Sequence, residues 1–189
     1  MVRRGGAGSM TAEQFDERAD FLAANISSFG GGTSSGASVN CITGVVDESL
    51  DLFFQMLEAP RFEQERIDVE RENALEDMKQ RNDDPETISD REWSWLMRGQ
   101  EHFTGKELTK DELYAVTRDE MVDFHKKYWR PDNMVIAVSG DVSPQDILAK
   151  LEKRFADFKV TGPAVPWPPP PPKYTPQAAA QPLAKLLRS

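Results

Sequence analysis

The amino-acid sequence predicts an α/β or α+β fold for residues 1–160, in which helices and a sheet form packed layers. One segment of strand length alternates Ala37, Val39 and Cys41 with polar residues, and a second, at 134–138, is almost continuously apolar. The stretches around both segments carry apolar residues at helical spacing. Strand segments separated by several long helices are typical of such a layered fold.

The helices are predicted from capping signals and from apolar periodicity. Thr11 with Gln14, and Thr117 with Glu120, have the spacing of capping boxes, in which side chain and backbone satisfy each other at a helix start. Asp47 is expected to cap a further helix. The predicted helices cover about 11–25, 47–60, 63–82 and 84–99, and two more begin at 117 and 143.

The two strand segments differ in their expected surroundings. Residues 27–44 are rich in Ser, Gly, Thr and Val, which predicts a Gly-rich turn followed by a strand. The run at 134–138 follows the turn sequence at 130–133, and its apolar character suits a strand that is covered on both faces of a sheet.

Composition excludes several classes of function. The formal net charge of −9 argues against nucleic acid or an anionic membrane as partner, because both require clustered Lys and Arg. Cys41 stands alone, so neither an internal disulfide nor a cysteine zinc site is expected. Arg3 and Arg4 have the charge of a signal-peptide start, but glycines follow in place of an apolar segment. The chain as written is therefore expected to be cytoplasmic, and periplasmic or exported if the true start lies upstream.

The character of the sequence changes after residue 160. The proline run at 166–172 favours polyproline II, which behaves as a stiff spacer. Residues 161–189 are therefore predicted to be a proline-rich linker or tail. A ligand for a proline-recognition domain is the alternative interpretation of the same residues.

Common catalytic motifs do not account for this sequence. The Gly-rich stretch at 29–36 lacks the lysine of a phosphate-binding loop and the spacing of a dinucleotide fingerprint. His102 and His125 are the only histidines, and neither lies in a paired metal-binding motif. Neither is expected to make a metal site by its spacing, and His125 is expected to be an ordinary structural residue.

The acidic helix predicted at 63–82 raises the question of which carboxylates point inward. Ile67, Ala74, Leu75 and Met78 define one apolar stripe at helical spacing. At the margin of that stripe lie Glu70 and Asp77, and opposite it, in solvent, lies Glu76. Glu70 and Asp77 are therefore the candidate functional acids, with a surface salt bridge as the simpler alternative.

With these residues located, the chain resembles the pitrilysin/insulinase family of zinc metallopeptidases, the inverzincins, whose signature is HxxEH. The resemblance covers most of residues 1–160 and rests on the order and spacing of several pieces. These pieces are APRF at 59–62, DDP at 83–85, GKELTK at 105–110, AVTRDEMVDFH at 115–125, YWRPDN at 128–133 and VSGDV at 138–142.

The resemblance implies a fold, a metal and a site. It implies an α+β fold with helices packed on one mixed, mostly antiparallel sheet, and zinc as the cofactor of the parent family. Counting back from Asp84-Pro85 places Asp77 at the position of the family's third zinc ligand, and Glu70 at a supporting position. Both positions coincide with those selected by helical spacing.

The departures from the family pattern limit what is expected of this chain alone. HxxEH is absent, and its expected place is just before Met1, so the chain is expected to be an N-terminally incomplete first domain. Asp77 also has a shorter reach than the family's Glu. One carboxylate without two imidazoles cannot hold zinc or activate its water, so no bound cofactor and no catalytic residue are expected.

Three functions remain open at this stage. The chain is a partial or non-catalytic homologue of a zinc metalloendopeptidase, or a non-catalytic subunit that completes the peptide chamber of an active homologue, or a helical interaction module with a proline-rich tail. Its expected partner is a full-length or second-half homologue, and peptide substrate is expected only in such a complex. An exposed sheet edge is expected as well, because strands that would precede Met1 are missing.

Overall fold

The computed structural model describes residues 1–100, 102–103, 105–156, 160, 162–167 and 170. The described part divides into two compact units. The first comprises Met1–Gly30, Ser35–Ile67 and Thr117–Trp167, and the second comprises Asp68–Val116 with the hairpin tip Gly31–Ser34. The predicted domain boundary at 160 and most of the predicted tail at 161–189 adjoin or lie outside the described residues, so both stay predictions.

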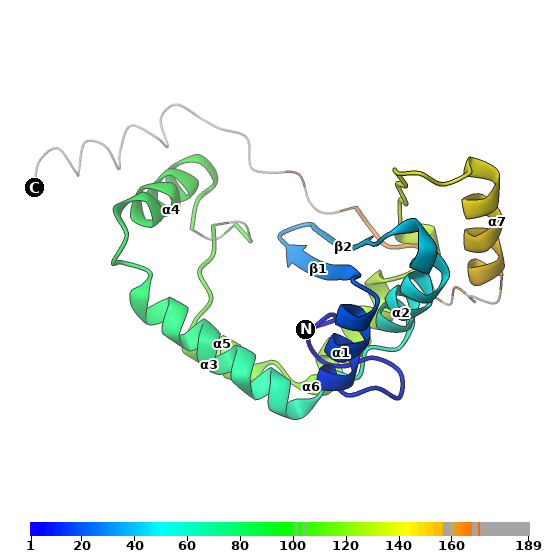
Figure 1. Ribbon diagram of the computed structural model, residues 1–189. Coiled ribbons are helices and arrows are strands. Elements are labelled where there is room, and N and C mark those ends of the chain that lie inside the picture. Colours follow the sequence, from blue (N-terminus) through cyan, green and yellow to red (C-terminus); the bar gives the residue numbers. More distant parts are fainter. Residues whose placement is uncertain (101, 104, 157–159, 161, 168–169, 171–189) are drawn as a thin grey trace, which may run out of the picture. The chain divides into compact units, whose positions relative to one another are not determined.

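Seven α-helices and one two-stranded antiparallel sheet make up the regular structure of these residues, which confirms the α+β class (Figure 1). In the described part, no helix combines the length and the apolar character that a membrane span requires.

Helix α1 (Ala12–Phe21) begins at the predicted capping box. The Thr11 hydroxyl accepts from the Gln14 amide, and the Gln14 side chain accepts from the Thr11 amide. The helix is shorter than the predicted 11–25 because Ala23 turns left-handed at φ 49°, which directs the chain into a strand. Phe15 and the small apolar residues on the same face of α1 are fully buried in the core.

Strands β1 (Asn25–Gly31) and β2 (Ser34–Asn40) form a hairpin. Gly32 occupies the turn with φ 30°, and a hydrogen bond of 2.8 Å joins the Ser27 and Ser38 hydroxyls across the pair. The Phe29 ring covers Gly36, where a Cβ would come within 2.6 Å of the ring. The predicted Gly-rich turn followed by a strand is present, but the turn is confined to residues 32–33, because Gly30 and Gly31 already lie in β1.

Helix α2 (Val46–Glu58) follows a short 3-10 turn at Thr43–Val45 and supplies Leu52 and Met56 to the core. The expectation that Asp47 caps this helix is wrong. The helix starts one residue earlier, and Asp47 lies in its first turn, where it makes an ion pair with Lys150.

Helices α3 (Gln64–Gln80), α6 (Arg118–Tyr128) and α7 (Pro144–Phe155) begin close to the predicted positions. The predicted capping box at Thr117 is present, and Ser143 caps α7 through the amide of Asp146. Between α6 and α7, a 3-10 turn covers Pro131–Asn133.

The strand predicted at 134–138 is not formed. Met134 leaves the turn in the extended region, with φ −122° and ψ 149°, but no described residue pairs with this segment as a strand. Its side chains face water, with Val135 98% exposed. An apolar run becomes a strand only when neighbouring strands satisfy its backbone, and the described part of the chain supplies none here.

The second unit carries the rest of α3, followed by α4 (Pro85–Arg98) and α5 (Lys110–Ala115). Asp84 caps α4 by accepting from the Thr87 amide, as the Asp-Pro sequence predicts. A capping box at Thr109 starts α5, a short helix that the sequence analysis missed. Neither α4 nor α5 buries a residue completely, so this unit has a thin core.

Candidate functional site

The two carboxylates selected from the sequence lie on α3 in the second unit. Asp77 is exposed, and Glu70 is half-buried and engaged in a polar interaction. A rise of 1.5 Å per residue separates their backbones by about 10 Å along the helix, which is too far for both to bind one metal ion unaided. Within the described ranges, no three His, Cys, Asp or Glu side chains gather as a metal site would require.

Glu76, assigned to solvent from the helical spacing, is exposed at the surface of α3. Lys79 donates to its carboxylate at 3.0 Å and Gln80 at 2.8 Å. These hydrogen bonds, Lys79 first, hold the pKa of Glu76 below its usual value. The acid next to the expected ligand position therefore makes only local surface contacts.

The two histidines are also engaged locally. His102 packs against Phe103 in the second unit, with ring centroids 4.4 Å apart. His125 lies on α6 in the first unit between the rings of Phe62 and Trp129, with centroid distances of 6.0 Å to each. Neither imidazole belongs to a gathered set of metal-binding side chains among the described residues.

His125 differs from these groups in being buried. Its side chain is buried, its Nε2 has no hydrogen-bond partner among the described residues, and a hydrogen bond links it to the backbone of Leu57. Burial lowers the pKa of His125 below its usual value, and the nearby charge of Lys126 acts in the same direction. In this position the imidazole packs as part of the core of the first unit.

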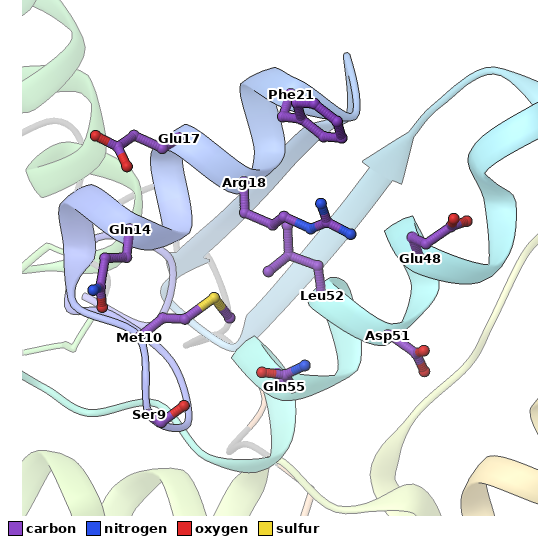
Figure 2. A pocket seen from close by; sticks show the side chains of 10 residues that line it. All are labelled: Ser9, Met10, Gln14, Glu17, Arg18, Phe21, Glu48, Asp51, Leu52 and Gln55. Carbon is purple, nitrogen blue, oxygen red and sulfur yellow. The ribbon is translucent and has the colours of Figure 1, made fainter.

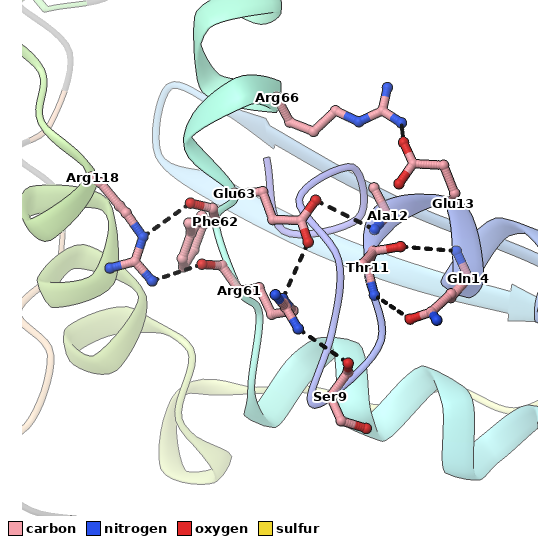
Figure 3. Close-up of polar contacts among 10 residues, drawn as sticks. All are labelled: Ser9, Thr11, Ala12, Glu13, Gln14, Arg61, Phe62, Glu63, Arg66 and Arg118. Carbon is pink, nitrogen blue, oxygen red and sulfur yellow. Dashed lines mark hydrogen bonds and ion pairs between the residues drawn. The ribbon is translucent and has the colours of Figure 1, made fainter.

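A polar junction in the first unit joins three distant parts of the chain (Figure 3). Amides of Arg61 and Glu63 donate to the carbonyl oxygens of Gly6 and Gly5, at 3.1 and 3.2 Å. Gly6 has φ 77°, and a Cβ there would approach the Met10 carbonyl oxygen to 2.8 Å, so glycine is required. The N-terminal loop at 5–6 is thus joined by backbone hydrogen bonds to the segment 61–63, which precedes α3.

Arg118 completes this junction from the start of α6. Its guanidinium donates to the carbonyl oxygens of Phe62 and Arg61, at 3.0 and 2.8 Å. Phe62 is buried with φ 50°, a conformation that costs free energy for any residue other than glycine. The junction holds the APRF sequence in place, and the polar contacts show that this sequence has a structural role.

A hollow of about 770 Å³ lies between α1 and α2 in the first unit (Figure 2). Leu52 and Met10 contribute apolar surface, and Phe21, at 79% exposure, lies at its edge beneath the Arg18 guanidinium. Its acidic side chains are Glu17, Glu48 and Asp51. This arrangement of acidic and apolar side chains can accept a cationic or apolar side chain.

Large apolar side chains are exposed in both units. In the first unit, the segment 134–138 is the longest such stretch. Large apolar residues exposed by 60% or more are Phe21, Phe29, Ile42, Trp93, Val135 and Trp167. Surfaces of this kind are typical of polypeptides that are covered by further chain or by a partner.

Comparison with known proteins places the chain in a recognisable class. A family model described as "Peptidase M16 inactive domain" matches residues 115–185. An uncharacterized zinc protease of Mycobacterium leprae is 29% identical over 98 residues, which are 51% of this chain and 22% of that protein. An uncharacterized zinc protease of Streptomyces coelicolor is 27% identical over 109 residues, which are 57% of this chain and 24% of that protein.

Solved structures share the fold. The peptidase M16 inactive domain of Pseudomonas fluorescens superposes with a TM-score of 0.77 and 20% identity, covering 90% of this chain and 42% of that one. The periplasmic protease PqqL of Escherichia coli gives a TM-score of 0.68 and 15% identity, covering 88% of this chain and 20% of that one.

The fold is α+β and is shared with the M16 inactive domain, and the sequence matches the model of that domain over residues 115–185. The chain is a homologue of the M16 zinc proteases, and the resemblance to the pitrilysin/insulinase family is confirmed. It spans about a quarter of the length of the curated relatives it matches, with 22% and 24% as two examples.

Sequence reasoning missed the residues that organise the first unit. Arg118 and Phe62 both fall in the quoted family motifs, but neither periodicity nor capping spacing indicates that an arginine at a helix start will bind two carbonyl oxygens far away in the chain. The capping box of α5, formed by Thr109 and Glu112, has the same spacing as the two boxes that begin at Thr11 and Thr117. That spacing could have revealed α5 in the sequence.

Proposed function

We propose that this chain is a non-catalytic or partial homologue of M16 zinc endopeptidases, unable to hydrolyse peptides alone, which completes the peptide chamber of an active homologue. The observation that carries the proposal is the exposed apolar surface of a chain that corresponds to only part of its relatives. A polypeptide of this fold with Val135 98% exposed needs a covering partner to remove that surface from water.

The residues present do not fit the zinc ion that the parent family implies. A zinc site needs several nitrogen, sulfur or oxygen ligands on one ion, and hydrolysis needs a water position as well. Asp77 is an exposed carboxylate, and the described residues bring no second and third ligand to it. No catalytic step is therefore assigned to this chain, and a peptide substrate enters the proposal only through the complex.

The test combines the purified chain with the full-length M16 homologue from the same genome. Gel filtration with light scattering should give a stoichiometric complex, and addition of the chain should change kcat/KM of the homologue on a quenched fluorescent peptide. The chain alone should not cleave the peptide with zinc added.

Two controls make this test decisive. An inactive homologue whose HxxEH glutamate is replaced by Gln should still bind the chain but should show no cleavage, which assigns all activity to the partner. Zinc-dependent cleavage by the chain alone, lost in Asp77→Ala, would overturn the non-catalytic assignment. Absence of any complex would overturn the partner role.

A further inference from the structure

The segment 134–138 combines strand composition with a backbone that pairs with no strand in the part of the chain that the structure describes. It contains no charge and no proline, and its residues include the β-branched Val135, Ile136 and Val138. No backbone hydrogen bond found among the loops and turns of the described residues involves it. Val135, Ile136 and Val138 are 98%, 49% and 50% exposed. In a strand conformation, both of its faces would be apolar, as in a strand buried inside a sheet.

The segment is also anchored at both ends. Before it, the buried guanidinium of Arg130 binds the Asp132 carboxylate through two hydrogen bonds of 2.9 and 2.6 Å, and the Pro163 carbonyl oxygen at 2.8 Å. After it, Ser143 caps α7, which is joined to α2 by ion pairs of Lys150 and Arg154. Because both ends are fixed, little additional ordering is needed when a strand pairs with it.

We propose that 134–138 is an acceptor strand, which pairs through its backbone with an apolar β-strand supplied by the M16-type partner polypeptide. This inference rests on the proposed function and names the surface through which the partner docks. Strand addition of this kind gives affinity through main-chain hydrogen bonds and specificity through alternate side chains.

Relative lengths favour an M16-type polypeptide as the occupant. The Pseudomonas fluorescens protein shares the fold over 90% of this chain, yet this chain corresponds to only 42% of it. That protein therefore carries additional polypeptide beyond the shared part, and additional polypeptide of this kind in an M16-type partner can supply a strand to 134–138.

Charge argues against a second copy of this chain as the occupant. Each copy has a formal net charge of −9, so two copies repel each other.

The test measures binding of the same full-length M16 homologue to Val135→Lys and to Ile42→Lys. Both replacements add one cation to an exposed aliphatic position in the first unit, so neither should impair folding. A lysine on a strand edge opposes pairing, and Val135→Lys should raise Kd by about tenfold or more, whereas Ile42→Lys should change it by about twofold or less.

Amide hydrogen exchange measured by NMR tests the backbone contact directly. Amides of 134–138 should exchange rapidly in the chain alone and slowly in the complex. Protection of alternate amides indicates pairing on one edge, and protection of every amide indicates pairing on both.

The outcomes separate this inference from the proposed function. A complex that forms while these amides still exchange rapidly, or that binds Val135→Lys as tightly as wild type, overturns the acceptor strand but leaves the partner role standing. Dimerisation of the chain through 134–138 in the absence of the homologue assigns the segment to a second copy and overturns the inference. Failure to form any complex overturns both.

Discussion

The Nε of Arg118 donates to the carbonyl oxygen of Phe62 at 3.0 Å, although the two residues lie 56 positions apart in the chain. The same guanidinium also donates to the Arg61 carbonyl oxygen. One side chain therefore holds the carbonyl groups of two consecutive residues, of which Phe62 has a left-handed backbone conformation. This pair joins α6 to the segment that precedes α3 and defines the polar junction of the first unit.

Replacing Arg118 with Ala should therefore lower the free energy of unfolding by about 1 kcal/mol, because hydrogen bonds to two carbonyl oxygens are lost at a half-exposed position. Urea denaturation followed by circular dichroism measures this loss. The exposed Arg98 in α4 offers a matched control, and Arg98→Ala should change stability by less than about 0.5 kcal/mol. Equal effects of the two replacements would contradict a specific role for Arg118.

The left-handed residue after α1 provides a second prediction. Ala23 is exposed with φ 49°, so Ala23→Gly removes backbone strain without loss of packing and should raise the free energy of unfolding by about 0.5 kcal/mol. Ala149 is equally exposed but lies inside α7, where the same replacement should lower stability by about 1 kcal/mol. Thermal and urea denaturation of both variants should give opposite signs, and a shared sign would contradict the assignment.

Acid titration of the α5 capping box provides a third prediction. The Lys106 ammonium donates to Glu112, and hydrogen bonds from Thr109 add to it, which lowers the pKa of Glu112 to about 2. Because the folded pKa is below the unfolded one, this contribution to stability is present above pH 4.5 and is lost as pH falls toward 2. Carbon-13 NMR of the Glu112 carboxyl should show this low pKa, and Lys106→Met should raise it. An unchanged pKa in that variant would show that Lys106 is not the main cause.

Buried His125 provides a fourth prediction. Burial lowers its folded pKa from 6.5, so between the two values the unfolded chain binds a proton that the folded chain does not. Stability should therefore fall as pH decreases below about 6.5, a direction that follows from the lowered pKa. Urea denaturation at pH 7.5 and 5.5 measures the slope. His125→Gln should reduce it, and a slope that is unchanged in this variant would assign the pH dependence to other groups.

Local signals predicted most of the helices and little of the sheet. The capping boxes at Thr11 and Thr117 and the Asp84 cap depend on residues three apart, so they are visible in a short window of sequence. Strand formation at 134–138 depends on a neighbour, which the composition of the segment cannot reveal. The helix start at Val46 was not predicted either, because α2 begins without a side-chain cap and Asp47 pairs instead with Lys150 of α7.

The candidate site was predicted in the same partial way. Helical spacing correctly predicted that Glu76 is exposed. It placed Glu70 and Asp77 only at the margin of the apolar stripe of α3. Whether a marginal carboxylate meets a ligand depends on what other elements bring to it. The junction around Arg118 escaped prediction for the same reason, since its acceptors are backbone atoms that any sequence provides.

The strength with which α7 is held on α2 should depend on ionic strength. Lys150 and Arg154 pair with Asp47, Asp51 and Glu58 at the surface, while Phe155 packs on Phe54 at a centroid distance of 5.3 Å. In about 1 M salt the screening length falls to about 3 Å, which removes most of the ionic attraction and leaves the ring contact. High salt should then loosen α7 and open the preceding loop to proteases, so purification buffers of low ionic strength will preserve the intact chain best.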